Sequence, residues 1–338
     1  MNCTKEEIVT LLDSEGASRE ALFARAAALK RATVGDGVYL RGLIEYSNVC
    51  RKNCLYCGIR RDAKCERYTL TESQVEAAAR LAYEKNYGSV VLQGGENQSA
   101  GHIETITRLI GKIKALSDGR LGITLSLGEH SRETYRRWFD AGAHRYLLRI
   151  EASNPDLYRM IHPRDGMHDY ASRIGAIRDL RSEGYQVGTG VMIGLPFQST
   201  EDLAGDLLFM KEMDIDMCGM GPYVVSHGTP LAVHSEKLRP EMWRFDMTLK
   251  MIAVLRLMMP DINIAATTAL QAIDPDGRMK AIAAGANVVM PNLTPDQLRG
   301  NYNLYDNKPL SFDSRLTEEN IRYGEWGDSL RFRSRKVE

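Results

Sequence analysis

The sequence predicts an α/β fold, a single TIM-type (β/α)8 barrel that follows a short helical extension. Eight short β-prone runs alternate with amphipathic helical stretches along most of the 338 residues. Strongly apolar strands between helices are typical of a parallel sheet that helices cover. Eight such units fit a closed barrel better than an open, doubly wound sheet. No low-complexity linker interrupts residues 38 to 300, so we expect one barrel domain there.

The expected strands are short and β-prone, and helical periodicity fills most of the intervals. The strands are VYLRGLIEYSN from Val38, SVVLQGGE from Ser89, GITLSLGE from Gly122, HRYLLRIE from His144, QVGTGVMIG from Gln186, MCGMGPYV from Met217, NIAATTA from Asn263 and NVVMPN from Asn287. The helices are expected over residues 71–86, 102–117, 131–141, 169–183, 200–213 and 240–258. Helical patterns are weak after Asn263, so the last quarter of the barrel is the least defined.

Both ends of the chain lie outside the predicted barrel. Residues 4–12 and 18–32 have apolar residues at helical spacing. We expect them to form a helical extension, residues 1–37, that acts as a lid or plug. The tail, residues 301–338, is polar, aromatic and poorly periodic, and we expect it to wrap the barrel.

The composition limits where the protein acts and what it binds. Lys plus Arg and Asp plus Glu both number 44, so no global field attracts nucleic acid or an anionic membrane. No apolar run approaches a membrane-spanning length, and the N-terminus carries acidic residues where a signal peptide needs an apolar core. We therefore expect a cytoplasmic protein. The neutral charge and the low aromatic content of 7% indicate no interface, so a monomer is the default.

Four of the six cysteines, Cys50, Cys54, Cys57 and Cys65, lie within sixteen residues. In a chain without an export signal, such a cluster favours metal binding or catalysis over disulfides. The first three have the spacing C-x3-C-x2-C in EYSNVCRKNCLYCGIR, directly after the first expected strand. Because the loops after the strands form the catalytic face of a barrel, we expect the thiolates at that face.

Three thiolates can hold three irons of a 4Fe-4S cluster and leave the fourth iron open for a ligand. A closed electron-transfer cluster usually takes four cysteines. The main alternative is a zinc site, which normally needs four ligands, but the sequence contains no second C-x2-C pair and no H-x3-H pair. Cys65 stays open as a further ligand, although a lone nearby cysteine is more often a small buried side chain.

The cysteine spacing, Tyr56 before the third cysteine and the position after the first strand resemble the radical S-adenosylmethionine superfamily. The resemblance implies that the open iron chelates the amino and carboxylate groups of S-adenosylmethionine. It also implies that an electron from the cluster breaks a C–S bond of this cofactor. The resulting 5′-deoxyadenosyl radical would then abstract hydrogen from a substrate or add to it.

The same resemblance implies a set of cofactor-binding residues. QGGEN after the second strand is similar to the GGE motif of the family, which meets the methionine amino group; two adjacent glycines are otherwise an ordinary turn. Glu151 is a candidate acceptor for ribose hydroxyls, and Arg173 is a candidate partner for the carboxylate. A plain salt bridge or a surface role is the alternative for each. The cofactor-binding candidates are Tyr56, Gly94, Gly95, Glu96, Ser126, Glu151 and Arg173.

Longer stretches narrow the resemblance. RGLIEYSNVCRKNCLYCGIRRD, RYLLRIEASNP and GANVVMPNLTP are similar to the FeFe-hydrogenase maturases of the HydE type, over nearly the whole chain. This implies a role in H-cluster assembly beside other hydrogenase maturases, with an electron donor such as ferredoxin. The implied substrate is an organometallic iron-cysteine precursor that bears CO and cyanide. Some members carry a second cluster near the C-terminus, but no cysteine follows Cys218, so we expect one 4Fe-4S cluster.

Other interpretations stay open at this point. A methylornithine synthase that rearranges lysine has the same kind of cluster, and a biotin synthase-like enzyme is more distant. An iron-sulfur electron carrier or a structural zinc protein belongs to a different class altogether. GTGVMIGLP near the fifth strand misses the register of a dinucleotide-binding fingerprint, so we do not expect NAD binding.

The expected cavity is rich in hydrogen-bond donors, which favours an anionic or carboxylate-bearing small molecule. Arg149 and Glu151 alternate onto one inward face of the fourth strand, where a buried pair needs partners. Thr267 and Thr268 cannot both face inward on a regular strand unless the strand end bulges. The candidate substrate-contacting residues are Arg41, Gln93, Arg149, Thr267, Thr268 and Tyr305.

Overall fold

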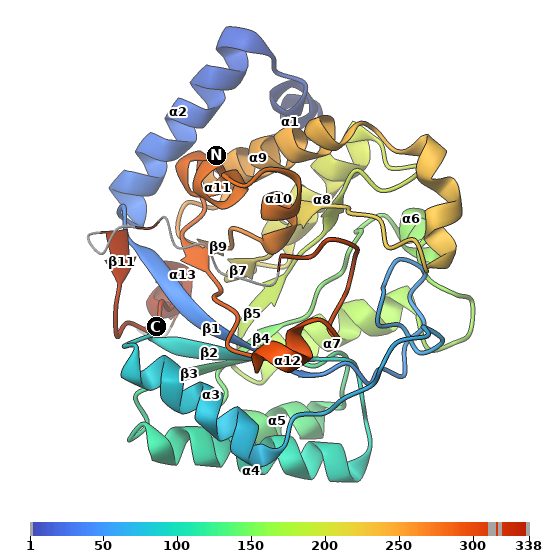
Figure 1. The fold of residues 1–338 in the computed structure, drawn as a ribbon. Coiled ribbons are helices and arrows are strands. Elements are labelled where there is room, and N and C mark those ends of the chain that lie inside the picture. Colours follow the sequence, from blue (N-terminus) through green and yellow to red (C-terminus); the bar gives the residue numbers. More distant parts are fainter. Residues whose placement is uncertain (1–2, 310–315, 317–319, 336–338) are drawn as a thin grey trace.

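The computed structural model describes residues 3–309, 316 and 320–335. Figure 1 shows parallel strands surrounded by helices. The strands of the barrel are β1 (Val38–Ser47), β2 (Ser89–Gly94), β3 (Gly122–Ser126), β4 (Arg145–Leu147), β5 (Gln186–Thr189), β7 (Met217–Cys218), β9 (Asn263–Ile264) and β10 (Val288–Val289). Each of them lies within one of the eight predicted runs.

The eight strands form a nearly closed parallel barrel. They are hydrogen-bonded in the order β10-β1-β2-β3-β4-β5-β7-β9. The two ends of this row meet at a parallel bridge between Ala265 and Val288, where the amide of Ala266 donates to the carbonyl of Val288 at 2.9 Å. The predicted fold class is therefore confirmed.

Most of the helices that follow the strands begin where the sequence places a capping residue. They are α3 (Glu72–Glu84), α4 (Ala100–Leu116), α5 (Arg132–Asp140), α7 (Tyr170–Ser182), α8 (Thr200–Glu212) and α9 (Glu241–Met258). The first five start after Thr71, Ser99, Ser131, Asp169 and Ser199, each of which accepts a hydrogen bond from an amide of the first turn. All six lie within two residues of the predicted ranges.

The sequence did not predict several short helices. These are α6 (Pro155–Met160), the 3-10 helix η1 (Pro230–Lys237), α10 (Thr268–Ile273), α11 (Gly277–Ala284) and α12 (Asp296–Arg299). Helices this short do not show a clear hydrophobic period, so pattern reading misses them. β6 (Met192–Ile193) and β8 (Gly221–Pro222) lie within the fifth and sixth predicted runs, but they are strands separate from the barrel sheet. They pair with each other in a two-stranded sheet.

The N-terminal helices do not form the expected lid or plug. α1 (Lys5–Leu12) packs on α8 and α9, and α2 (Gly16–Thr33) packs on α9 and α11. Ile8, Leu12 and Leu22 are fully or almost fully buried in these contacts. Figure 1 shows both helices on the outside of the molecule, beside α9. They extend the outer helical layer because their apolar faces need a partner, which the long apolar α9 supplies.

The described parts of the tail contact both ends of the barrel. Residues 302–308 lie at the carboxyl ends of the strands, whereas β11 (Ile321–Arg322) pairs with the start of β1, and α13 (Leu330–Arg335) follows it. At the amino ends of the strands, the side-chain amide of Asn263 donates to the carbonyl of Gly327 at 2.7 Å. The tail thus closes the base of the barrel. None of the described helices is both long and apolar enough to cross a bilayer.

Asp206 on α8 is a buried carboxylate whose ionisation opposes folding. One of its oxygens accepts from the amide of Ser153 at 2.7 Å, and burial raises its pKa to about 7. The folded state therefore favours the protonated form. The stability that this provides is complete below the unfolded pKa near 4 and is lost as the pH rises to about 7.

We therefore expect Asp206→Asn to stabilise the protein more at pH 8 than at pH 5. The amide keeps an oxygen acceptor for Ser153 but carries no charge. The difference should be roughly 3 kcal/mol, from about 1.4 kcal/mol per pH unit between pH 5 and 7. Denaturant unfolding of wild type and variant at both pH values measures it. An equal effect of the substitution at the two pH values would contradict the prediction.

Candidate active site

A cavity of about 340 Å³ opens at the carboxyl ends of the barrel strands. It is lined by residues from the cysteine loop, from the ends of most barrel strands and from the tail. The predicted site residues that line it are Cys50, Cys54, Cys57, Tyr56, Gln93, Gly94, Gly95, Glu96, Ser126, Arg149, Glu151, Arg173, Thr267, Thr268 and Tyr305. One predicted residue, Arg41, does not belong to this group.

Arg41 lies near the opposite end of the barrel. It is the fourth residue of β1, pairs in register with Ser89 at the start of β2, and donates to the carbonyl of Gly327 at 3.1 Å. Its side chain is completely buried, and burial together with the positive charge of Arg145 lowers its pKa. The expectation that Arg41 reaches the mouth was wrong. β1 has ten residues, and Arg41 faces inward six residues before its end.

Thr267 and Thr268 both line the cavity because neither lies on a strand. β9 ends at Ile264, and the two threonines form the start of α10. The hydroxyl of Thr267 donates to the carbonyl of Met220 at 3.2 Å, and the hydroxyl of Thr268 lies 2.9 Å from that of Tyr305. We expected that only one of the two threonines could face inward, because side chains alternate along a regular strand. At the start of a helix this alternation does not apply.

The cysteine loop and the QGGEN segment lie directly against each other. The amide of Glu96 donates to the sulfur of Cys50 at 3.3 Å, and the amide of Arg51 donates to the carbonyl of Glu96 at 2.9 Å. A Cβ atom on Gly95 would lie 2.4 Å from the carbonyl oxygen of Val49. The second glycine is therefore needed for this close approach, whatever ligand the motif also meets.

Arg67 holds the cysteine loop on both sides of the three cysteines. Its guanidinium donates to five carbonyl oxygens, those of Asn48 (2.6 Å), Ile59 (2.9 Å), Arg60 (2.6 Å), Arg61 (3.1 Å) and Ala63 (3.1 Å). A loop without regular structure leaves carbonyls that need donors, and the planar fork of Arg supplies several at once. Sequence reasoning missed this residue because it lies ten residues beyond the last cysteine of the motif.

We expect Arg67→Lys to weaken loading of the metal cluster. A single ammonium group cannot reach all five carbonyls, so the loop should lose its fixed shape. Iron content after anaerobic reconstitution should fall at least twofold, while the far-ultraviolet circular dichroism of the barrel stays unchanged. Arg80→Lys, at an exposed position on α3, is the matched control. Full iron content in Arg67→Lys would contradict this role.

The three thiols suit a cluster rather than a ready-made site for one ion. Burial raises the pKa of Cys54 to about 12, although the charge of Arg173 opposes the shift. Thiolates that bind metal must therefore release protons. Among the residues that the structure describes, no three Cys, His, Asp or Glu side chains gather around one ion position. Three cysteines along one cavity wall match a cluster in which each thiolate binds a different iron.

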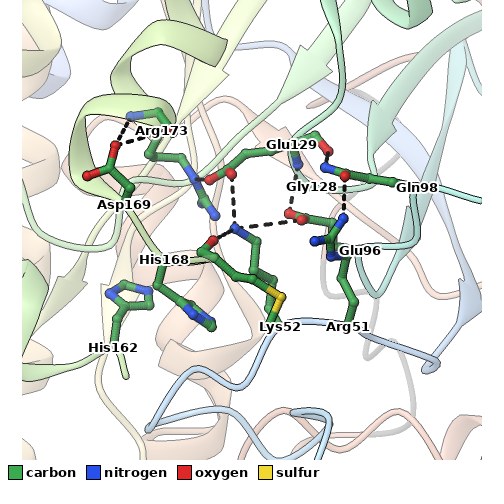
Figure 2. Close-up of polar contacts among 12 residues, drawn as sticks. Arg51, Lys52, Glu96, Gln98, Gly128, Glu129, His162, His168, Asp169 and Arg173 are labelled. Atoms are coloured by element: carbon green, nitrogen blue, oxygen red, sulfur yellow. Dashed lines mark hydrogen bonds and ion pairs between the residues drawn. The ribbon is translucent and has the colours of Figure 1, made fainter. Parts of the chain in front are cut away.

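A buried network of two acids and two bases lies behind the cysteine loop (Figure 2). The ammonium of Lys52 lies 2.9 Å from a carboxylate oxygen of Glu129 and 3.6 Å from one of Glu96. Arg173 on α7 pairs with the other oxygen of Glu129 and donates to the carbonyl of Arg149 at 2.5 Å. The amide of Glu129 donates to Glu96 at 2.8 Å. The network thus fixes the orientation of Glu96 and Arg173, two predicted cofactor-binding residues.

Arg149 and Glu151 form a bidentate ion pair in the wall of the cavity. The two N–H···O distances are 2.7 and 2.8 Å, and Arg149 also donates to the carbonyl of Val191 at 3.0 Å. Glu151 has a φ of +66°, a left-handed conformation that is uncommon for a residue other than glycine. The pair is thus held at an unusual turn after β4, and each residue is the partner that the other needs.

Sequence reasoning missed several residues that complete the cavity wall. Lys308 from the tail forms a buried ion pair with Glu45 of β1, and Tyr302 accepts from Gln93 across 3.4 Å. Lys52 and Glu129 were also missed as a pair. Their partners are far away in the sequence, so no local motif indicates them. Cys65, left open as a ligand, does not line the cavity.

Comparisons with known proteins agree with this arrangement. The family model of the radical SAM superfamily matches residues 44–210. The chain is 45% identical to the FeFe-hydrogenase maturase subunit HydE of Thermotoga maritima. The alignment spans 295 residues, which are 87% of this chain and 81% of that protein. It is 28% identical over 303 residues to 3-methylornithine synthase of Methanosarcina barkeri, covering 88% and 82%. A crystal structure of methylornithine synthase shares the fold, with a TM-score of 0.76 at 24% identity over 94% of this chain and 89% of that one.

The barrel, the three cavity cysteines and the superfamily match define this chain as a radical S-adenosylmethionine enzyme. Its cofactors are a 4Fe-4S cluster and S-adenosylmethionine. Within that superfamily, the chain belongs to the HydE family of FeFe-hydrogenase maturases.

Proposed function

We propose that this chain acts in the assembly of the H-cluster of FeFe-hydrogenase, on an organometallic iron-cysteine precursor that bears CO and cyanide. The observation that carries the proposal is the 45% identity to a HydE maturase along 87% of the chain. We further propose that it acts in the cytoplasm, as a monomer, beside other hydrogenase maturases and with ferredoxin as electron donor.

When bound, the cluster supplies the electron that cleaves S-adenosylmethionine to methionine and a 5′-deoxyadenosyl radical. Within the proposal, Cys50, Cys54 and Cys57 bind three of its irons as thiolates. The carbonyls beside Gly94 and Gly95 would accept from the methionine amino group. Together with Glu96 and Tyr56, which also line the cavity, this segment would bind the methionine end of the cofactor.

The remaining proposed contacts to S-adenosylmethionine match the charge of each of its groups. Arg173 is proposed to pair with the cofactor carboxylate, to which it can turn from Glu129. Ser126 would contact the methionine moiety, and Glu151, which Arg149 holds in place by an ion pair, would accept from the ribose hydroxyls.

The substrate is proposed to bind deeper in the same cavity, against donor groups. Gln93, Arg149, Thr267, Thr268 and Tyr305 supply these donors, and all of them line the cavity. Burial raises the pKa of Tyr305 to about 12, so its hydroxyl keeps its proton at neutral pH. Neutral hydrogen-bond donors around the guanidinium of Arg149 favour a substrate that carries a carboxylate or another negative charge.

A maturation assay tests this function. Cells that produce an FeFe-hydrogenase and its other maturases, but lack their own HydE, should regain hydrogenase activity when this chain is expressed. A variant with Cys54→Ser should not restore it. Turnover of lysine to 3-methylornithine by the purified enzyme, without rescue of the hydrogenase, would overturn the proposal in favour of the synthase relatives.

A further inference from the structure

The outer part of the cysteine loop is strongly basic, although the whole chain is neutral. Between Arg51 and Arg67 there are six Lys and Arg residues and two acidic ones, while the complete sequence has 44 of each kind. Arg51, Arg61 and Lys64 are exposed, and Arg60 is half-buried. Lys52 is occupied inside the protein, between Glu96 and Glu129, and the guanidinium of Arg67 is occupied by five carbonyls of the loop. The other four basic side chains carry the positive charge that this segment presents to solvent.

This basic surface belongs to the loop that carries the thiols. The amide of Arg61 donates to the carbonyl of Lys52 at 2.7 Å, so Arg61 packs on the turn between the first two cysteines. The guanidinium of Arg60 donates to the side chain of Asn53, next to Cys54, at 3.0 Å. Val49, which precedes Cys50, is 41% exposed and gives the surface an apolar spot. A protein bound here would therefore contact the loop that carries the cysteines.

We propose that this surface, formed by Val49, Arg51, Arg60, Arg61 and Lys64, is the docking site of an acidic one-electron carrier protein. The inference rests on the assigned radical chemistry, which consumes an electron that must come from outside the chain. Short-lived redox complexes have small interfaces and rely on complementary charge for fast encounter. Four basic residues on the loop that holds the cluster ligands meet both requirements, since they would attract an acidic carrier to the loop nearest the cluster in sequence.

The charge pattern also argues against a general polyanion site. Asp62 and Glu66 are exposed among the basic residues, and Asp62 pairs with Arg61 at 2.9 Å. A neutral chain with a short, interrupted basic segment lacks the extended positive face that nucleic acid requires. A compact partner with its own patch of acidic side chains fits better.

The test compares a protein donor with a small-molecule donor on the reconstituted full-length enzyme. The probe is a purified, reduced acidic ferredoxin, and the product is 5′-deoxyadenosine formed from S-adenosylmethionine. The variant R61E/K64E should lower kcat/KM for ferredoxin at least tenfold at low ionic strength, with dithionite-driven cleavage unchanged. The difference in kcat/KM for ferredoxin between wild type and variant should become smaller at about 0.3 M salt, because salt screens the attraction between the basic surface and the acidic ferredoxin.

The variant R80E/K85E on and just after α3 is the matched control, and it should behave as wild type with both donors. Equal ferredoxin kinetics in R61E/K64E and wild type would overturn the inference. An equal loss with ferredoxin and dithionite would overturn it as well, since the segment would then act on the cluster itself. Failure of the proposed role in H-cluster assembly leaves this comparison intact, because cleavage is measured without the maturation substrate.

Discussion

Cys54→Ser should abolish both the cluster and the cleavage of S-adenosylmethionine. Cys54 is the middle of the three cavity cysteines, and the described lining of the cavity contains no fourth cysteine that could replace it as a ligand. The reconstituted variant should lack the broad visible absorbance of an iron-sulfur cluster. 5′-Deoxyadenosine formation under dithionite should fall at least 1,000-fold, to background.

Cys65→Ser is the control for this experiment, because Cys65 lies on the same segment but outside the cavity. It should keep the absorbance and the activity of wild type. If Cys65→Ser also lost the cluster, the assignment of three ligands would be wrong, and a fourth protein ligand would have to close the site.

Glu151→Gln should give the second large effect. The substitution leaves the charge of Arg149 in the cavity wall without its bidentate partner. Breaking a buried pair from one side costs about 3–5 kcal/mol, which corresponds to roughly 150- to 5,000-fold in an equilibrium constant. If Glu151 accepts from the ribose, this loss should appear as weaker binding of S-adenosylmethionine and as a lower kcat/KM for its cleavage.

Asp216→Asn is a matched control for Glu151→Gln. Asp216 is as buried and pairs with Arg181 at 2.6 Å, but it lies at the amino end of β7, away from the cavity. Both variants should unfold more easily than wild type, yet only Glu151→Gln should change the affinity for S-adenosylmethionine. Equal affinities in the two variants would show that the Arg149–Glu151 pair has only a structural role.

The order of strands and helices was predictable because each unit carries its own local signals. Apolar runs define the strands, and Thr71, Ser99 and Ser131 mark helix starts by a capping hydrogen bond that the sequence alone suggests. The N-terminal helices were recognised as helices, but not placed. An amphipathic face shows that a helix packs against another surface, but it does not identify that surface. In the structure, the surface is that of the apolar α9.

The site residues at the ends of the strands could be predicted from the sequence. Residues whose role depends on their depth along the barrel axis, or on a partner far away in the sequence, could not. Alternation along β1 shows that Arg41 faces inward, but the depth of a residue depends on where its strand starts, which tail contacts at Gly327 help to define. Lys52 and Glu129 are 77 residues apart, and Glu45 and Lys308 are 263 apart. Such pairs form only when the barrel closes, so no sequence window contains them.

The central claim is that one 4Fe-4S cluster with an open iron is bound by Cys50, Cys54 and Cys57. Chemical analysis of the reconstituted wild-type chain, combined with electron paramagnetic resonance of the reduced protein, tests it most directly. We expect about four irons and four sulfides per chain, and a spectrum that changes when S-adenosylmethionine is added. Stoichiometric zinc, about eight irons, or a spectrum that S-adenosylmethionine leaves unchanged would contradict it.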